Sequence, residues 1–111
     1  MNHEKLDCYR ELLSVSKELG GIMKGWPRGS GYLVDQLRRA ISSAVLNLAE
    51  GNGKRGQTRE RKRFFQISMG SIAEVAAALD LAAAFSLIPA KVQEENKATL
   101  RAAYNRIRRL S

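Results

Sequence analysis

The sequence predicts an all-α protein, an up-down-up-down antiparallel four-helix bundle formed by a single domain over residues 1–111. Three observations indicate this fold. Apolar residues recur at spacings of three and four in four segments, glycine and proline separate these segments, and no period-two strand pattern occurs. Short connections between the segments favour antiparallel packing of successive helices.

Each predicted helix carries an apolar face. The first face, within residues 6–23, consists of Leu6, Tyr9, Leu13, Ser16 and Leu19, widened by Leu12, Ile22 and Met23. The second, within residues 33–48, consists of Leu33, Leu37, Ala40, Ile41, Ala44 and Leu48. The third, within residues 65–83, consists of Phe65, Met69, Ile72, Val75, Leu79, Ala82 and Ala83. The fourth is narrower and consists of Leu100, Ala103, Tyr104, Ile107 and Leu110.

The breaks between these helices are glycine-rich or contain proline. They are residues 25–31 (GWPRGSG), residues 51–56 (GNGKRG) and Pro89, which ends one helix and suits the first turn of the next. Thr58 is the candidate N-cap of the third helix. The spelling GxGxxG at residues 51–56 is no dinucleotide fingerprint, because no strand precedes it. Trp26 is expected to be a hydrophobic plug, the alternative being a platform on which a base stacks.

Composition excludes several classes of function. The chain has one Cys and one His, which argues against a disulfide, a zinc site or a di-iron site. We expect no metal, no cofactor, no catalytic residue and therefore no enzyme. The polar start of the chain and the shortness of its apolar stretches predict a cytoplasmic protein without a membrane partner, in which Cys8 is an inert thiol.

The third predicted helix is apolar around much of its circumference between residues 72 and 88, where seven alanines occur. A helix that is apolar all round is buried on all sides, so we expect a homo-oligomer in which a second copy covers its outer face. The alternative is that alanine, a good helix former, lies on a solvated face. The pair Gly70 and Ser71 is expected to mark a close crossing with the second helix.

A polar stripe accompanies the apolar face of the second helix. It consists of Gln36, Arg39, Ser43, Asn47 and Glu50. Ser71 and Glu74 share one side of the third helix, and we expect the two polar sets to face each other, with Arg39 pairing with Glu74. The alternative, an acid/base pair of Glu50 and Glu74, is disfavoured because no nucleophile, histidine or metal ligand is near either residue in sequence.

Residues 32–74 resemble a small bacterial family of four-helix-bundle proteins. The matching elements are residues 35–40 (DQLRRA), Ser43, residues 47–51 (NLAEG), a basic Gly-Lys-Arg turn, Phe64, Ile67, Ser68, Gly70, Ser71 and Glu74. This family is the 23S ribosomal RNA intervening-sequence protein family, also labelled S23 ribosomal protein. One departure is that residues 43–46 read Ser-Ala-Val-Leu where the family often has Ser-Ile-Pro, so the second helix should lack a kink.

The resemblance implies four-helix bundles that assemble into barrel-shaped homopentamers. It also implies similarity to the accessory variability determinant proteins of diversity-generating retroelements, which are basic pentamers that bind a reverse transcriptase and its template RNA. It brings no catalytic residues.

Basic residues outnumber acidic ones by 19 to 11, giving a net charge of +8. Two segments, residues 51–65 and residues 91–111, concentrate this charge. We expect them to form one basic rim at one end of the bundle, because the second helix ends, the third begins and the fourth ends there. The candidate nucleic-acid-binding residues are Lys54, Arg55, Arg59, Arg61, Lys62, Arg63, Arg106, Arg108 and Arg109.

We therefore expect an oligomeric module that binds the phosphate backbone of RNA or DNA without reading sequence. The first segment supports this reading because cations at a helix start oppose the helix dipole without an evident structural gain. The alternative readings are a solvated charged turn and a protein-interaction scaffold whose basic rim meets an acidic partner.

Overall fold

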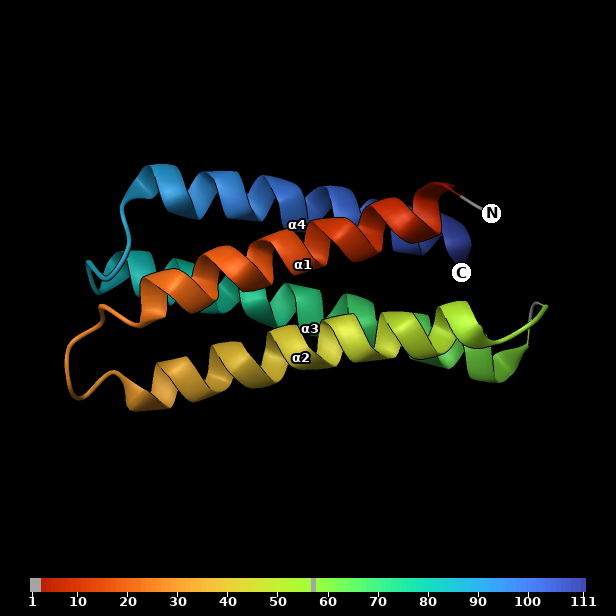
Figure 1. Cartoon of the computed structure of the whole chain (residues 1–111), viewed down its shortest axis with the longest axis horizontal. Helices are drawn as coiled ribbons and strands as arrows, with labels where there is room; N and C mark the ends of the chain where they lie inside the picture. Colours follow the sequence, from red (N-terminus) through yellow and green to blue (C-terminus); the bar gives the residue numbers. More distant parts are fainter. Residues whose placement is uncertain (1–2, 57) are drawn as a thin grey trace.

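The computed structural model describes residues 3–56 and 58–111 and contains four helices (Figure 1). They are α1 (His3–Met23), α2 (Gly31–Gly53), α3 (Arg59–Ala84) and α4 (Ala90–Leu110). Successive helices run antiparallel along the long axis of a body that measures 45 × 23 × 18 Å. The predicted all-α antiparallel four-helix bundle is confirmed.

The four helices form two closely packed pairs. Helix α2 packs most extensively against α3, and α1 packs against α4, while the α3–α4 and α1–α2 contacts are less extensive. Both chain ends and the α2–α3 connection lie at one end of the bundle, and the other two connections lie at the opposite end (Figure 1). We call the first of these the turn end.

The core differs from the expected one on α1. Its buried residues are Cys8, Leu12, Val15, Leu19 and Met23. Leu13, expected in the core, is 42% exposed. Apolar residues of α1 form two overlapping stripes, and packing against α4 selects the stripe that contains Cys8 and Val15. On α4 the expected core residue Tyr104 is likewise exposed.

The helix ends of α3 follow from its sequence. The Thr58 hydroxyl accepts a hydrogen bond from the Arg61 amide at 3.1 Å, which confirms Thr58 as the N-cap. At the other end Ser86 has a positive φ of 60°, and the Leu87 amide donates to the Ala82 carbonyl at 2.8 Å. This is a Schellman motif with serine where glycine is usual. Pro89 is the N-cap of α4 and directly precedes its first turn, rather than lying within that turn as expected.

The glycine in the middle of α3 does not mark a close helix crossing. Gly70 is exposed, and a Cβ atom added there would have nothing within 4 Å. The expectation for Gly70 is therefore wrong, although its neighbour Ser71 does contact α2.

Helix α3 contains a long apolar stretch. By length and composition alone it is able to cross a membrane, since an 18-residue window has a mean hydropathy of 1.5. This stretch differs from the expectation that the apolar segments are too short to cross a membrane. One helix of this kind is weak evidence for a membrane span, because the core helix of a soluble bundle satisfies the same criteria, and α3 packs against both α2 and α4.

Candidate nucleic-acid interface

The connection between α2 and α3 is anchored by a contact between Gly51 and Phe65. A Cβ atom on Gly51 would lie 2.5 Å from the Phe65 ring, closer than side-chain contacts allow. Phe65 is fully buried, so its ring has little freedom to move aside. Glycine at position 51 therefore lets the last turns of α2 approach the start of α3.

Arg61 lies on this contact and is buried, with 6% of its surface exposed. Its guanidinium carbon is 4.9 Å from the centre of the Phe65 ring, and Nη1 donates to the Gly56 carbonyl at 3.4 Å. Its Nε is buried without a hydrogen-bond partner among the described residues. The expectation that Arg61 presents its charge to a nucleic acid is therefore not met, because this side chain supports the turn from inside.

The other cations of the connection point into solvent. We call residues 54–63 the basic turn. Its exposed cations are Arg55, Arg59, Lys62 and Arg63. Within residues 3–56 and 58–111 none of these four side chains forms an ion pair or hydrogen bond. Lys54 is different, since it pairs with Glu60 at 3.2 Å and lies 5.6 Å from the centre of the Phe64 ring.

The position of these cations is electrostatically unfavourable in the isolated chain. Arg59, Lys62 and Arg63 occupy the first turns of α3, where the helix dipole is positive and each cation costs about 0.3–1 kcal/mol at low salt. An anion bound beside them would relieve this repulsion and also suit the helix N-terminus.

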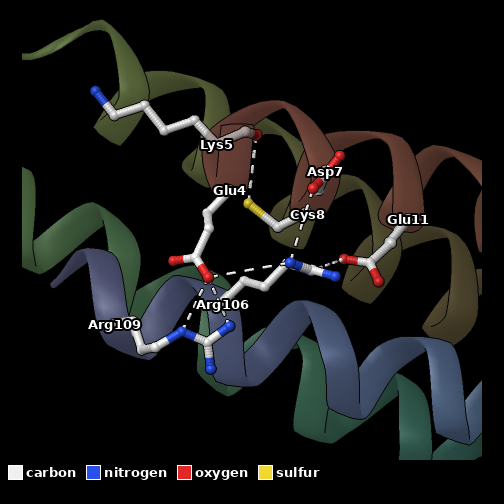
Figure 2. A network of polar contacts seen from close by, with 7 residues as sticks. All are labelled: Glu4, Lys5, Asp7, Cys8, Glu11, Arg106 and Arg109. Atoms are coloured by element: carbon white, nitrogen blue, oxygen red, sulfur yellow. Dashed lines mark hydrogen bonds and ion pairs between the residues drawn. The ribbon is translucent and has the colours of Figure 1, made fainter. Parts of the chain in front are cut away.

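The second basic segment is largely neutralised by α1. Arg106 Nε donates to Glu11 at 3.0 Å, and Arg106 Nη1 lies 3.7 Å from Asp7. Arg109 Nη2 donates to Glu4 at 2.7 Å. Figure 2 shows these side chains reaching across from α4 to the first turns of α1. The hydrogen bonds from Arg109 hold the pKa of Glu4 below its ordinary value.

This network corrects the expected basic rim. The start of α1 lies at the turn end with its three acids, which the sequence analysis did not place there. Arg106 and Arg109 therefore belong to an ionic contact between the first and last helices. Arg108 alone of the three candidate arginines of α4 is exposed without an ion pair to any described residue.

Cys8 lies next to this network but is buried. Burial raises the pKa of its thiol to about 11, so the thiol stays protonated near neutral pH. Within the described ranges, no group of three His, Cys, Asp or Glu side chains is arranged to hold a metal ion.

The polar residues of α2 and α3 meet at serines. The Ser71 hydroxyl donates to Ser43 Oγ at 2.7 Å, and Asn47 Nδ2 donates to the Ser43 carbonyl at 2.8 Å. The Ser68 hydroxyl donates to the Ala44 carbonyl at 2.7 Å and is fully buried. Sequence reasoning missed Ser68, although it lies one turn before Ser71 and this spacing was a signal for it.

The remaining members of the expected polar network do not join these serines. Gln36, Arg39, Glu50 and Glu74 are exposed. Among the described residues no ion pair links Arg39 to Glu74, so the expected pair is not formed. Glu50 and Glu74 likewise form no hydrogen-bonded acid/base pair in the described part of the chain.

A groove lies between α2 and α3 toward the end opposite the basic turn. It has a volume of about 440 Å³, and its lining is Tyr32, Leu33, Gln36, Ala40, Glu74, Ala77, Ala78 and Leu81. Tyr32 is 59% exposed and Leu81 is 48% exposed. The outer face of α3 is therefore apolar and open to solvent in the single chain, as its alanine content indicated.

Trp26 lies in the α1–α2 connection at the end opposite the basic turn. It is partly buried against the core, and its Nε1 is buried without a hydrogen-bond partner among the described residues. These contacts agree with a hydrophobic plug rather than with an exposed stacking platform.

Comparison with known proteins identifies the family. The sequence profile of the 23S rRNA-intervening sequence protein family matches residues 4–110, which is nearly the whole chain and includes all four helices. No significant match was found among curated protein sequences. The resemblance first noted over residues 32–74 thus extends to α1 and α4, and the chain belongs to the 23S rRNA-intervening sequence protein family.

Proposed function

We propose that this chain is a non-enzymatic, homo-oligomeric module that binds nucleic acid through the basic turn. The observation that carries the proposal is the group of four exposed cations, Arg55, Arg59, Lys62 and Arg63, which have no anionic partner among the described residues. Three of them lie at the positive end of the α3 dipole, where a phosphate would be stabilised.

The proposed contacts are to phosphates and not to bases. Lysine and arginine that neutralise phosphates release condensed counterions, so binding weakens steeply as salt rises. The basic turn has no element that enters a groove to read base edges, and binding is therefore expected to be independent of sequence. Both RNA and DNA offer the required phosphates.

Oligomerisation would multiply these contacts. The apolar groove between α2 and α3 and the exposed outer face of α3 support association with further copies. We propose the homopentamer that the family resemblance implies. A ring of five would present five basic turns to one strand, and weak contacts would add through multivalency.

The experiment compares two triple variants that remove the same charge. In the test variant Arg59, Lys62 and Arg63 become Gln. In the control variant Lys17, Lys24 and Arg28 become Gln; these are exposed cations of α1 and of the α1–α2 connection, away from the turn end. Fluorescence anisotropy with mixed-sequence RNA and DNA oligonucleotides, from low to moderate salt, measures affinity and its salt slope, and thermal melts check the fold.

The test variant should bind all sequences more weakly and with a flatter salt slope, while the control variant should bind nearly as wild type does. Equal losses in both variants would indicate attraction by net charge alone, and the proposed site would be wrong. No affinity of the wild-type chain at low salt would refute the nucleic-acid function. Light scattering after size exclusion tests assembly, for which a monomer mass at micromolar concentration would contradict the oligomer.

A second candidate is a protein-interaction scaffold, and the exposed apolar groove beside Tyr32 and Leu81 favours it. On the family resemblance, we extend the main proposal to a reverse transcriptase and its template RNA as partners. Binding of an acidic protein without binding of random oligonucleotides would favour the scaffold.

A further inference from the structure

One face of α4 combines cations with an exposed aromatic ring. Spacings of four, three and four place Lys97, Arg101, Tyr104 and Arg108 on the same face of the helix. Lys97 pairs with Asp80 of α3 at 2.8 Å, so this face borders α3. We call these four residues the α4 stripe.

The α4 stripe lies outside the core. The buried residues Leu100, Ala103 and Ile107 point to a different face of α4, and Tyr104 is 37% exposed. Within the described ranges the side chains of Arg101, Tyr104 and Arg108 make no hydrogen bond or ion pair. The stripe therefore presents a partly exposed tyrosine between two arginines that have no ion pair among the described residues.

The stripe is strongly basic toward its Arg108 end, whereas Glu94 lies beside Lys97 and Arg101 at its other end. Residues 97–111 contain five cations and no acid, and residues 61–73 of α3 contain no acid either. Lys62 lies a whole number of helical turns from Asp80, so both are on the face of α3 that borders α4. Antiparallel packing places Lys62 toward the Arg108 end of the stripe.

The other side of α4 has the opposite character. Arg106 and Arg109 face α1, where Glu4, Asp7 and Glu11 already neutralise them (Figure 2). A polyanion that approaches the turn end would thus be attracted to the α3 side of α4. The cations on this side of α4 that have no ion pair to a described residue therefore extend the basic surface of the basic turn along the bundle.

We propose that the α4 stripe, together with Lys62, forms a path for single-stranded nucleic acid, with a base stacked on Tyr104 and phosphates held by Arg101 and Arg108. This inference rests on the proposed function and specifies the form of nucleic acid that is bound. Only an unpaired strand can offer the face of a base to a protein ring, because duplex bases are stacked on one another. Arg101 and Arg108 are about 10 Å apart along the helix axis at 1.5 Å per residue. Tyr104 lies between them in the sequence and on the same face, so a base stacked on its ring would have a cation on either side along the helix axis.

The experiment measures the affinity of the full chain for three labelled probes of equal length: oligodeoxythymidine, oligouridine and a blunt DNA duplex. The variants are Tyr104→Ala, Tyr104→Phe and, as the matched control, Phe85→Ala. Phe85 is an exposed aromatic residue directly after α3, at the end opposite the basic turn, and it does not line the groove between α2 and α3. Thermal melts and light scattering verify that each variant keeps the fold and the assembly of wild type.

Tyr104→Ala should weaken binding of both single strands about tenfold, which equals about 1.4 kcal/mol and lies within the range for stacking of one base. Duplex binding should not change, Tyr104→Phe should bind as wild type does because it keeps the ring, and Phe85→Ala should have no effect. A larger loss with oligouridine than with oligodeoxythymidine would assign the path to RNA, and the reverse would assign it to DNA.

Three results would overturn the inference while leaving the proposed function intact. The first is binding of wild type to oligonucleotides with no effect of Tyr104→Ala. The second is an equal loss for duplex and single strand. The third is a change in assembly mass in Tyr104→Ala, which would assign the ring to a contact between copies. Absence of any oligonucleotide binding by wild type would instead refute the proposed function itself.

Discussion

Replacement of Gly51 by alanine provides a sharp test of the packing at the turn end. Alanine is the better helix former by about 1 kcal/mol, so helix propensity alone predicts that Gly51→Ala stabilises the protein. The structure predicts the opposite, because the new methyl carbon would lie 2.5 Å and 2.7 Å from two atoms of the Phe65 ring.

The size of the effect follows from how little the ring can yield. Phe65 is fully buried, and the Arg61 guanidinium lies over its ring. Overpacking of this kind costs about 1–3 kcal/mol. Subtracting the gain in helix propensity leaves a net loss of about 0–2 kcal/mol in the free energy of unfolding. Each kcal/mol corresponds to a decrease in Tm of roughly 4 °C for a chain of this length.

Urea unfolding followed by circular dichroism measures this change, with Gly70→Ala as the matched control. Gly70 is also inside a helix, but a Cβ atom there meets nothing within 4 Å, so alanine should stabilise the chain by up to about 1 kcal/mol. A Phe65→Leu change in the Gly51→Ala background should recover part of the loss, giving a favourable coupling energy in a double-mutant cycle. If Gly51→Ala stabilises the chain as much as Gly70→Ala does, the anchoring role of the Gly51–Phe65 contact is wrong.

Three further predictions concern other parts of the bundle. Ser86→Gly should raise the free energy of unfolding by about 1 kcal/mol, because a φ of 60° is costly for serine and free for glycine. A lower free energy of unfolding in a urea titration would contradict this. The hydrogen bond from Lys97 lowers the pKa of Asp80 from its ordinary value of 3.8. Asp80 therefore stabilises the fold above that pH, and this stabilisation is lost as the pH falls through the lower pKa of the folded state. An acid titration of stability should show this loss, and Asp80→Asn should reduce it. The Cys8 thiol, buried and with a pKa of about 11, should react with a thiol reagent at neutral pH only as fast as the chain opens, and rapid labelling of the folded protein would refute its burial.

The helices and their ends were predictable from local sequence. Glycine-rich breaks and Pro89 separate the four segments, and Thr58 caps α3 as its residue type suggests. These signals act over a few residues, within reach of a single turn of helix. The rotation of α1 was not predictable in this way, because Leu13 and Val15 both fit an apolar stripe, and only packing against α4 decides which one is buried.

The location of the candidate site was predictable from the sequence, but which of its cations face solvent was not. The density of cations in residues 51–65 indicated the basic turn. It did not reveal that Arg61 is turned inward onto Phe65, because that contact depends on the gap left by Gly51 in another helix. The expected close crossing at Gly70 failed for the same reason: a glycine marks a close approach only where another helix packs against it, and none of the described helices does at Gly70.

The arginines of α4 show why charge counted along a sequence overstates a basic surface. Arg106 and Arg108 are two residues apart, which is about 200° around a helix, so they lie on nearly opposite sides of it. Arg106 meets Glu11 and Asp7 of α1, whereas Arg108 meets no anionic partner among the described residues. Attraction of a polyanion depends on cations that are not already paired, and these lie on the side of α4 that borders α3. A variant that removes Arg106 would therefore weaken mainly the contact between α1 and α4, whereas one that removes Arg108 would leave that contact intact and reduce the charge offered to a ligand.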